Sequence, residues 1–206
     1  MKRLLAVSAI FIHFIAYSQS EEHIQTIDVS PEKKADIQIF FSQYLDDTRN
    51  MEWDKLLDKT HPGLYKLASK EQLKAQLEEA FTNDIFTTSF DEIRFKDIPK
   101  AFSFENVKYY LIDYYSAFSF VFMKEESQSE EDFDNYLNLM QSLFKSQLKD
   151  SEVVKTDNTI SIKGDKQIVV IDDANMDGYK MLEVKKEMIN LYSVFLPKPV
   201  ITELFQ

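Results

Sequence analysis

The stretch Val107–Met123, VKYYLIDYYSAFSFVFM, decides the fold class of this chain. Its apolar residues occupy both sets of alternating positions, with Tyr110 and Ile112 in one set and Tyr109 and Leu111 in the other. A strand with this pattern is covered by other parts of the protein on both faces. At about 3.3 Å per residue the stretch would exceed about 50 Å, so we expect it to be strongly bent, broken or divided into two strands.

Three segments upstream of this stretch have the spacing of amphipathic helices, with apolar residues at intervals of three and four. The first begins after Ser30, an N-cap residue that precedes Pro31. The second begins at Trp53 and is short. The third runs from Ser69 to Phe81, and its first residues have the spacing of a capping box. We therefore predict three N-terminal helices, each with one buried face.

Downstream of residue 83 the sequence changes to strands that are interrupted by two helices. The stretch 87–98 alternates in polarity and predicts a half-buried strand. Residues 130–149 follow the N-cap Ser129 and predict an inserted helix, and residues 188–195 predict a C-terminal helix that two prolines end. Short strands are expected at 151–155, 159–163, 167–172 and 178–184, with turns at Asp157-Asn158 and Gly164-Asp165, and the two prolines are Pro197 and Pro199.

These elements together predict an α+β fold, in which three N-terminal helices pack on a curved antiparallel sheet, with an inserted helix and a C-terminal helix. No Gly/Ser/Pro-rich linker separates two cores, so residues 30–206 are expected to form a single domain. Residues 19–29 show no sustained period and are expected to form a flexible arm. A domain of this size can be stabilised by core burial alone, without disulfides.

The N-terminal residues have the pattern of a secretory signal peptide. Lys2 and Arg3 precede an apolar run, and the small residues Ala16 and Ser18 at its end fit a cleavage site. The run is shorter than the roughly 20 apolar residues of a membrane-spanning helix. We therefore predict that residues 1–18 are removed and that the protein is exported, either to the periplasm or to the exterior.

The composition excludes several classes of function. The chain has 206 residues and a formal net charge of −11, which would become −13 on loss of residues 1–18, because these contain two basic and no acidic residues. Such an acidic surface repels nucleic acid and anionic lipid headgroups. The chain contains no cysteine, which excludes disulfides, a lipid anchor attached through an N-terminal cysteine, and the commonest zinc sites.

The order of three short helices followed by long aromatic strands resembles the nuclear-transport-factor-like cone, also called the cystatin-like fold. The run Asn50–Leu57, NMEWDKLL, is similar to the second helix of that superfamily. The stretches Asp58–Phe81 and Leu196–Leu204 look like those of a group of exported proteins of Bacteroidota-type bacteria, to which no activity is assigned. The resemblance implies a cavity between the sheet and its helices, and helix 130–149 would cap or fill the mouth of the cone.

The run Asp173–Gly178, DANMDG, matches the opening of a calcium-binding loop, in which carboxylate and amide oxygens converge. The match fails at the twelfth position, where a bidentate Glu is expected and Val184 is found. Glu183 is one residue away and, in a strand, would face the opposite side. Strands rather than helices are also expected on both sides. We therefore favour a polar hairpin tip over a calcium site, and no metal ligand is assigned.

Two histidines, His23 and His61, would remain after loss of the signal peptide. Without cysteine they cannot supply the three or four ligands of a zinc site. No G-x-S-x-G motif accompanies His61, and the three dispersed glycines form neither a P-loop nor a dinucleotide-binding motif. We therefore expect His61 to end a helix and to bond to the local backbone, and we predict no cofactor.

Asp113 is the one acidic residue inside the stretch 107–123. In a cone-shaped cavity its pKa would be raised by burial, and it could act as a base together with tyrosine hydroxyls. The alternative is that Asp113 is solvated at a bulge or an edge, or pairs with a lysine, while the aromatic residues fill the core. We favour this alternative.

We therefore expect a non-enzymatic exported domain that binds a small apolar ligand or another envelope protein, through a cavity or through the face of helix 130–149. A small isomerase or dehydratase that uses Asp113 is the second hypothesis. A structural envelope protein is the third, and no residue of the sequence separates it from the first. No catalytic or binding residue is assigned.

Overall fold

The computed structural model describes residues 23–81 and 83–206. The predicted signal peptide, residues 1–18, lies outside the described residues. The described part of the predicted arm is attached to the sheet, because strand β1 (Gln25–Thr26) pairs with Ser103 and Phe102.

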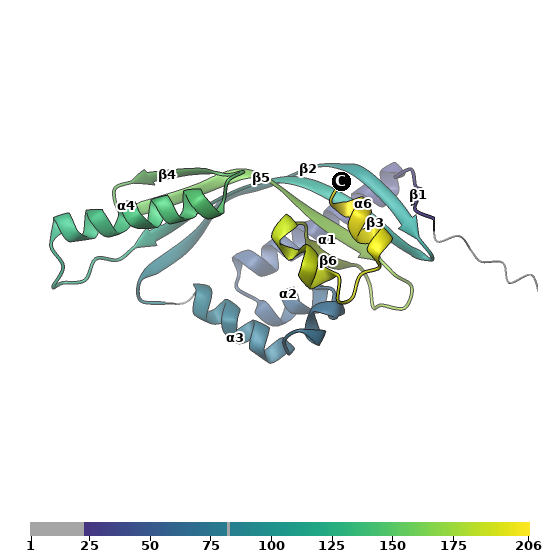
Figure 1. Ribbon diagram of the computed structural model, residues 1–206, viewed down its shortest axis with the longest axis horizontal. Coiled ribbons are helices and arrows are strands. Elements are labelled where there is room, and N and C mark those ends of the chain that lie inside the picture. Colours follow the sequence, from purple (N-terminus) through teal and green to yellow (C-terminus); the bar gives the residue numbers. More distant parts are fainter. Residues whose placement is uncertain (1–22, 82) are drawn as a thin grey trace, which may run out of the picture.

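The centre of the fold is a curved antiparallel sheet in which three strands are long (Figure 1). These are β2 (Phe86–Phe104), β3 (Val107–Phe122) and β5 (Thr159–Asp172). The shorter strands β4 (Glu152–Thr156) and β6 (Lys180–Glu183) pair with opposite ends of β5, both on the edge that faces away from β3. The predicted α+β architecture, with helices on a curved antiparallel sheet, is confirmed.

The strand β3 is continuous over its whole length, and the irregularities lie in its neighbour β2. The pairing of β2 with β3 shifts register between Phe90 and Glu92, between Phe95 and Asp97, and again before Lys100. Each shift adds residues to one strand only, which bends a sheet and increases its twist. The long stretch 107–123 is therefore bent, as expected, rather than broken into two strands.

The prediction of a turn at Gly164-Asp165 is wrong. Residues 159–163 and 167–172 belong to one strand, which pairs with β3 without interruption. A Cβ atom on Gly164 would lie 3.0 Å from the carbonyl oxygen of Asp150 and 3.3 Å from the Cα of Ser151. The glycine therefore permits close approach of another backbone inside a strand, which is the second common use of this residue besides turns.

The three predicted N-terminal helices are confirmed as α1 (Pro31–Arg49), α2 (Trp53–Lys59) and α3 (Lys70–Phe81). The Ser30 hydroxyl accepts a hydrogen bond from the backbone N–H of Lys33 at 3.2 Å. Ser69 and Gln72 form the expected capping box, with distances of 2.8 and 3.2 Å. Each cap satisfies a backbone group that the first turn of a helix leaves unpaired.

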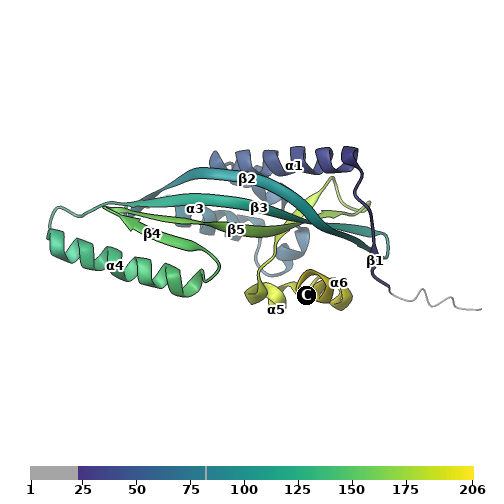
Figure 2. The ribbon, with the colours of Figure 1, turned by 90° about the horizontal axis from the view of Figure 1, so that it is seen from above.

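Helices cover both faces of one end of the sheet. Figure 2 shows α1 on one side, and α5 (Ile189–Tyr192) and α6 (Lys198–Leu204) on the other. The side chains facing α1 include Tyr110 and Ile112, and those facing α5 and α6 include Tyr109 and Leu111. Both sets of alternating positions in β3 are therefore buried, as the sequence predicts. The helix α1 covers one set, and α5 and α6 cover the other.

The C-terminal region departs from the prediction in how its helix ends. The expected single helix over 188–195 is a short 3-10 turn, Lys186–Met188, followed by the one-turn helix α5. Pro197 is the N-cap of α6 and Pro199 lies in its first turn. Proline is favoured at the start of a helix, where its missing N–H leaves no bond unmade. The two prolines therefore begin a helix instead of ending one.

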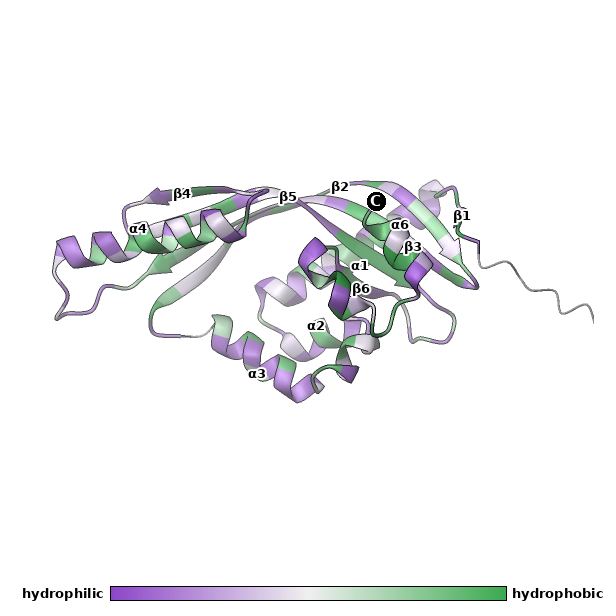
Figure 3. Cartoon of the chain, in the orientation of Figure 1, coloured by the Kyte–Doolittle hydropathy of each residue, from purple (hydrophilic) through white to green (hydrophobic). Residues whose placement is uncertain are grey.

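The inserted helix α4 (Glu130–Gln147) covers the other end of the sheet and does not lie over α1–α3 (Figure 1). Its buried residues Phe133 and Leu137 contact Phe122, Ile160 and Ile162. The Ser129 hydroxyl caps it by accepting from the N–H of Asp132 at 3.1 Å. We call α4 together with β4 the α4 lobe. Figure 3 shows hydrophilic and hydrophobic residues alternating along α4, as its one-sided packing requires.

A buried hydroxyl on β2 provides the first prediction. The Thr88 Oγ1 atom is buried and has no hydrogen-bond partner among the described residues. An unpaired buried hydroxyl loses its hydration without compensation. We expect Thr88→Val, which keeps the side-chain shape, to raise the free energy of unfolding by about 1 kcal/mol. Urea unfolding measures this free energy, and the same change at the exposed neighbour, Thr87→Val, is the control. A loss of stability in Thr88→Val would contradict the prediction.

Candidate ligand site

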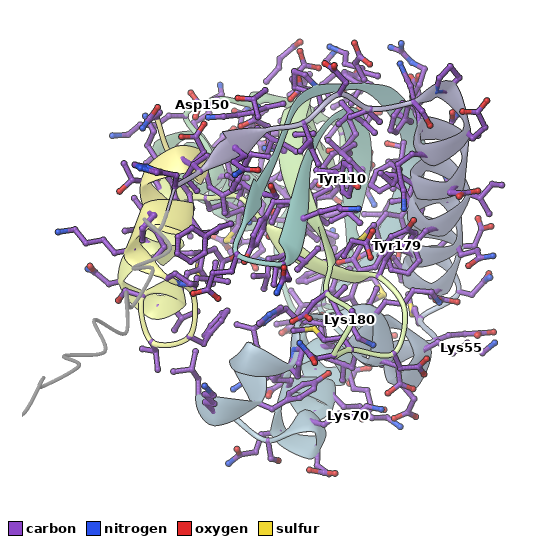
Figure 4. All side chains as sticks on the ribbon, turned by 90° about the vertical axis from the view of Figure 1, so that its right-hand side faces the viewer. Lys55, Lys70, Tyr110, Asp150, Tyr179 and Lys180 are labelled. Carbon is purple, nitrogen blue, oxygen red and sulfur yellow. The ribbon has the colours of Figure 1, made fainter. Side chains whose placement is uncertain are left out.

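An open pocket of about 540 Å³ lies where α1, α2 and the hairpin between β5 and β6 meet. Figure 4 labels three of its residues, Lys55 on α2 and Tyr179 and Lys180 on the hairpin side. This volume is in the range of sites for small organic ligands. The pocket is lined by Phe40, Lys55, Asp58, Lys59, Asp177, Gly178, Tyr179 and Lys180.

Two aromatic rings form the apolar part of the pocket. Phe40 and Tyr179 meet edge to face, with ring centroids 5.3 Å apart. Behind them, the Lys33 Nζ atom donates to the Tyr179 hydroxyl at 2.8 Å and to Asp172 Oδ2 at 3.2 Å. The bond to Tyr179, with the contribution of Asp172, raises the pKa of Lys33. Lys33 therefore stays charged and holds the Tyr179 ring in place against α1.

Most charges of the lining are already paired. Lys59 pairs with Asp47, Lys55 pairs with Glu52, and Asp58 Oδ1 lies 2.6 Å from the Nζ atom of Lys70. The pairs Lys59–Asp47 and Asp58–Lys70 connect α2 to α1 and α3, whereas Lys55–Glu52 is local to the start of α2. They leave the pocket close to electrically neutral except at two side chains.

The exceptions are Lys180 and Asp177. Lys180 Nζ donates to the backbone carbonyl of Asp58 at 2.7 Å, and no carboxylate of the described chain lies within 4.0 Å of it. Its charge is therefore not neutralised by an adjacent acid. Asp177 lies at the exposed tip of the hairpin and also has no ion pair within residues 23–81 and 83–206. The pocket thus has one lysine without an adjacent acid, Lys180, and one exposed acidic residue, Asp177.

The run Asp173–Gly178 is the connection between β5 and β6, flanked by strands as predicted. The Asp173 carboxylate accepts from the backbone N–H and from the side chain of Asn175, both at 2.9 Å. Gly178 has φ +65°, the left-handed conformation that glycine adopts without strain. Glu183 faces away and pairs with Lys185 at 2.8 Å. Among the described residues, no three acidic or histidine side chains come together to hold a metal ion.

His61 is bound to the local backbone, as predicted. The Nδ1 atom of its ring accepts from the backbone N–H of Gly63 at 3.0 Å, and the backbone N–H of His61 donates to the carbonyl of Met181, also at 3.0 Å. The imidazole stacks on Phe195 with ring centroids 5.2 Å apart. Burial lowers its pKa to about 4, despite the opposing charge of Asp173. The neutral, buried imidazole therefore caps the start of the 3-10 helix Pro62–Lys66, and the backbone of His61 connects this helix to β6.

The structure does not bring Asp113 to the pocket. Its neighbour Ile112 faces α1, so the Asp113 side chain projects from the opposite face of β3. There its Oδ1 atom accepts from the side-chain amide of Gln167 at 2.8 Å. Asp97, its partner on β2, lies between two of the register shifts. The bulges therefore lie in β2, opposite Asp113, and not at Asp113 itself, and its hydrogen-bond partner is a glutamine rather than the expected lysine.

Sequence reasoning missed the residues that form the pocket. It predicted only a buried face for the helix that carries Phe40, and it gave no role to Lys55, Lys59 or Lys180. The Asp and Gly residues of the hairpin predict a turn, but they do not predict that the hairpin lies beside α2. One usable signal was the pair Tyr179-Lys180 directly after the turn, because an aromatic and a cationic side chain there begin an edge strand.

Comparisons with known proteins identify no relative. No family model matches the chain, and searches of the curated proteins and of the solved structures found no significant match. Within residues 23–81 and 83–206, no helix has both the length and the apolar character needed to cross a membrane.

Proposed function

We propose that this protein is a non-enzymatic binding protein whose ligand is a small organic anion with an apolar body. The observation that carries the proposal is Lys180, which has no carboxylate of the described residues within 4.0 Å and lines the same pocket as the paired rings of Phe40 and Tyr179. An anionic group would bind to Lys180 and the apolar body would cover the rings. Recognition by a few polar groups in a largely apolar site is typical of small-molecule pockets.

The openness of the site sets the expected affinity. An exposed ion pair contributes only about 0.2–1 kcal/mol, because water screens it. The rings add the burial of apolar surface at about 25 cal/mol per Å². For a ligand of about ten non-hydrogen atoms we expect a Kd on the order of 0.1–1 mM. A natural ligand of higher affinity would have to reach beyond this pocket.

The test uses 3-phenylpropionate and its neutral analogue 3-phenylpropanamide, titrated by ligand-observed NMR. Lys180→Met is expected to weaken binding of the anion about two- to fivefold, because it removes an exposed ion pair and keeps the aliphatic stem. Asp177→Asn is expected to strengthen it about twofold, because it removes the acidic rim. The amide should bind the wild type and Lys180→Met equally. An anion affinity that Lys180→Met leaves unchanged, or no binding by either probe, would overturn the proposal.

We further infer that the protein is exported and that it acts in the periplasm or outside the cell. The support is the sequence pattern of residues 1–18, together with an acidic chain that lacks cysteine. The resemblance to the cystatin-like cone remains a prediction. The isomerase or dehydratase hypothesis has no supporting observation, since Asp113 lies on the far face of the sheet from α1.

A further inference from the structure

A second pocket, of about 350 Å³, lies on the other side of Lys55 from the first. It is formed by the connection between α1 and α2, by the start of α2 and by the side of α3 that faces α2. Lys55 lines both pockets, so the two hollows are neighbours along the solvent-facing side of α2. The second pocket is lined by Met51, Glu52, Trp53, Asp54, Lys55, Lys74 and Glu78.

The backbone at the rim of this second pocket is strained. Met51 has φ 55°, in the left-handed region, which costs a non-glycine residue about 1–2 kcal/mol. It follows the C-cap Asn50 of α1, and the N–H of Glu52 donates to the carbonyl of Asp47 at 2.8 Å. Glycine is the usual residue at this position after a helix. Methionine therefore occupies it at a cost in stability, and its apolar side chain is exposed.

We propose that the two pockets form one groove along α2, which binds an extended peptide segment of a partner protein. An acidic residue of the segment would bind Lys180 in the first pocket, and an apolar residue would contact Met51 in the second. The proposal rests on the proposed function, since it assigns the ligand of the first pocket to a longer chain. Strain kept at an exposed apolar side chain is the independent observation that extends the site to Met51.

The dimensions of α2 fit a short segment. The helical part of the groove, residues 53–59, is about 9 Å long at about 1.5 Å per residue, and the non-helical residues 51 and 52 lengthen it further. An extended peptide advances about 3.3 Å per residue, so about four residues would span it. The acidic and the apolar side chain should then be separated by two residues.

The charges of the second pocket favour an apolar side chain there. Lys74 lies 2.6 Å from Asp54 and 4.0 Å from Glu78, and Lys55 pairs with Glu52. Among the residues that the structure describes, these pairs leave one cation of the groove without an acidic partner, Lys180 at its far end. An uncharged, flexible thioether such as that of Met51 adapts to aliphatic side chains of different shape.

Other linear ligands fit less well. The Trp53 ring is buried against Phe81, with centroids 5.1 Å apart, so it offers no open face on which a sugar could stack. The strongly acidic chain repels nucleic acid. A peptide fits the three features of the groove: an acidic side chain binds the cation, an apolar side chain contacts the apolar anchor, and the backbone between them lies along a polar wall.

The sequence contains a single tryptophan, Trp53, and it lines the second pocket, so its fluorescence reports whether this pocket is filled. The probes are N-acetyl-Glu-Ser-Ser-Leu amide and N-acetyl-Leu-Ser-Ser-Glu amide, which cover both chain directions. We expect one of them to change the Trp53 emission, to bind at least about threefold tighter than 3-phenylpropionate, and to be displaced by it. 3-Phenylpropionate alone should leave the emission unchanged.

Met51→Gly separates the two proposals. It should weaken binding of the peptide about fivefold, leave the affinity for 3-phenylpropionate unchanged, and raise thermal stability because the strain is relieved. Met51→Leu is the control that keeps the apolar anchor.

If 3-phenylpropionate binds but neither peptide binds more tightly or changes the Trp53 emission, the peptide groove is overturned and the proposed function stands. If no probe binds, both fail. Emission that changes with protein concentration alone would assign the groove to a second copy of the chain and overturn the peptide.

Discussion

Replacing Gly63 with alanine is expected to lower the melting temperature by about 6–12 °C. A Cβ atom at this position would lie 2.3 Å from the Cδ2 atom of Phe195 and 2.8 Å from Nδ1 of His61. Both rings are packed, so the methyl group can be accommodated only if the imidazole stack or the Gly63 hydrogen bond is given up. Overpacking of this kind costs about 3 kcal/mol, which corresponds to that temperature shift in a domain of this size.

The control is Gly178→Ala. A Cβ atom there would meet nothing within 4 Å, and only its left-handed φ of +65° is unfavourable, at a cost of about 1 kcal/mol. The double variant Gly63→Ala with Phe195→Leu should lose less stability than the sum of its single changes, because the smaller side chain makes room for the methyl group. Equal melting temperatures for Gly63→Ala and Gly178→Ala would contradict the steric explanation.

The second large effect is a loss of stability in mild acid that depends on His61. Burial lowers the pKa of His61 from its ordinary value of 6.5 to about 4. Between these values the unfolded chain binds a proton that the folded chain does not, so protonation favours unfolding. The contribution of His61 is fully present above pH 6.5 and is lost as the pH falls toward 4. It amounts to about 3 kcal/mol, from the size of the pKa shift.

The measurement compares the wild type with His61→Asn by urea unfolding at several pH values. Asparagine offers an acceptor for the N–H of Gly63 and does not titrate. We expect the variant to be less stable at pH 7, and the difference between the two proteins to shrink by about 3 kcal/mol between pH 6.5 and pH 4. Carboxylates such as Asp97 and Asp134, whose pKa values are lowered by lysines, affect both proteins alike. A constant difference across this range would contradict the buried neutral imidazole.

The parts of the fold that local sequence determines were predictable. Ser30 and Ser69 predict where their helices begin, because a helix cap needs only backbone groups that are close in the sequence. Gly164 was misread because one residue type serves two purposes, and only the position of the Asp150 carbonyl shows which one applies. Pro199 was misread for a similar reason, since proline is found both after helices and in their first turn.

The candidate site depends on contacts that the sequence does not encode locally. Phe40 and Lys55 are separated from Tyr179 and Lys180 by more than a hundred positions, and the register of β6 on β5 brings them together. Asp113 shows the opposite difficulty. Asp113 lies on the face of the sheet that α5 and α6 cover near Leu111. Beside Asp113 that face is polar, at Gln167 of β5, and the sequence of β3 does not show where the cover by these helices ends.

The pairing of Val121 with Thr159 has a consequence for how the protein can change over evolutionary time. The chain leaves the three long strands at the end of β3 and returns to them with β5 beside the same place, after a detour that contains α4 and the edge strand β4. Because the exit and the return are neighbours, the detour can be shortened, extended or exchanged by insertion and deletion without displacing the strands that carry the pocket. Only an apolar cover over Phe122 and Ile160 must be kept. The α4 lobe can therefore diversify as a separate module while selection preserves the pocket.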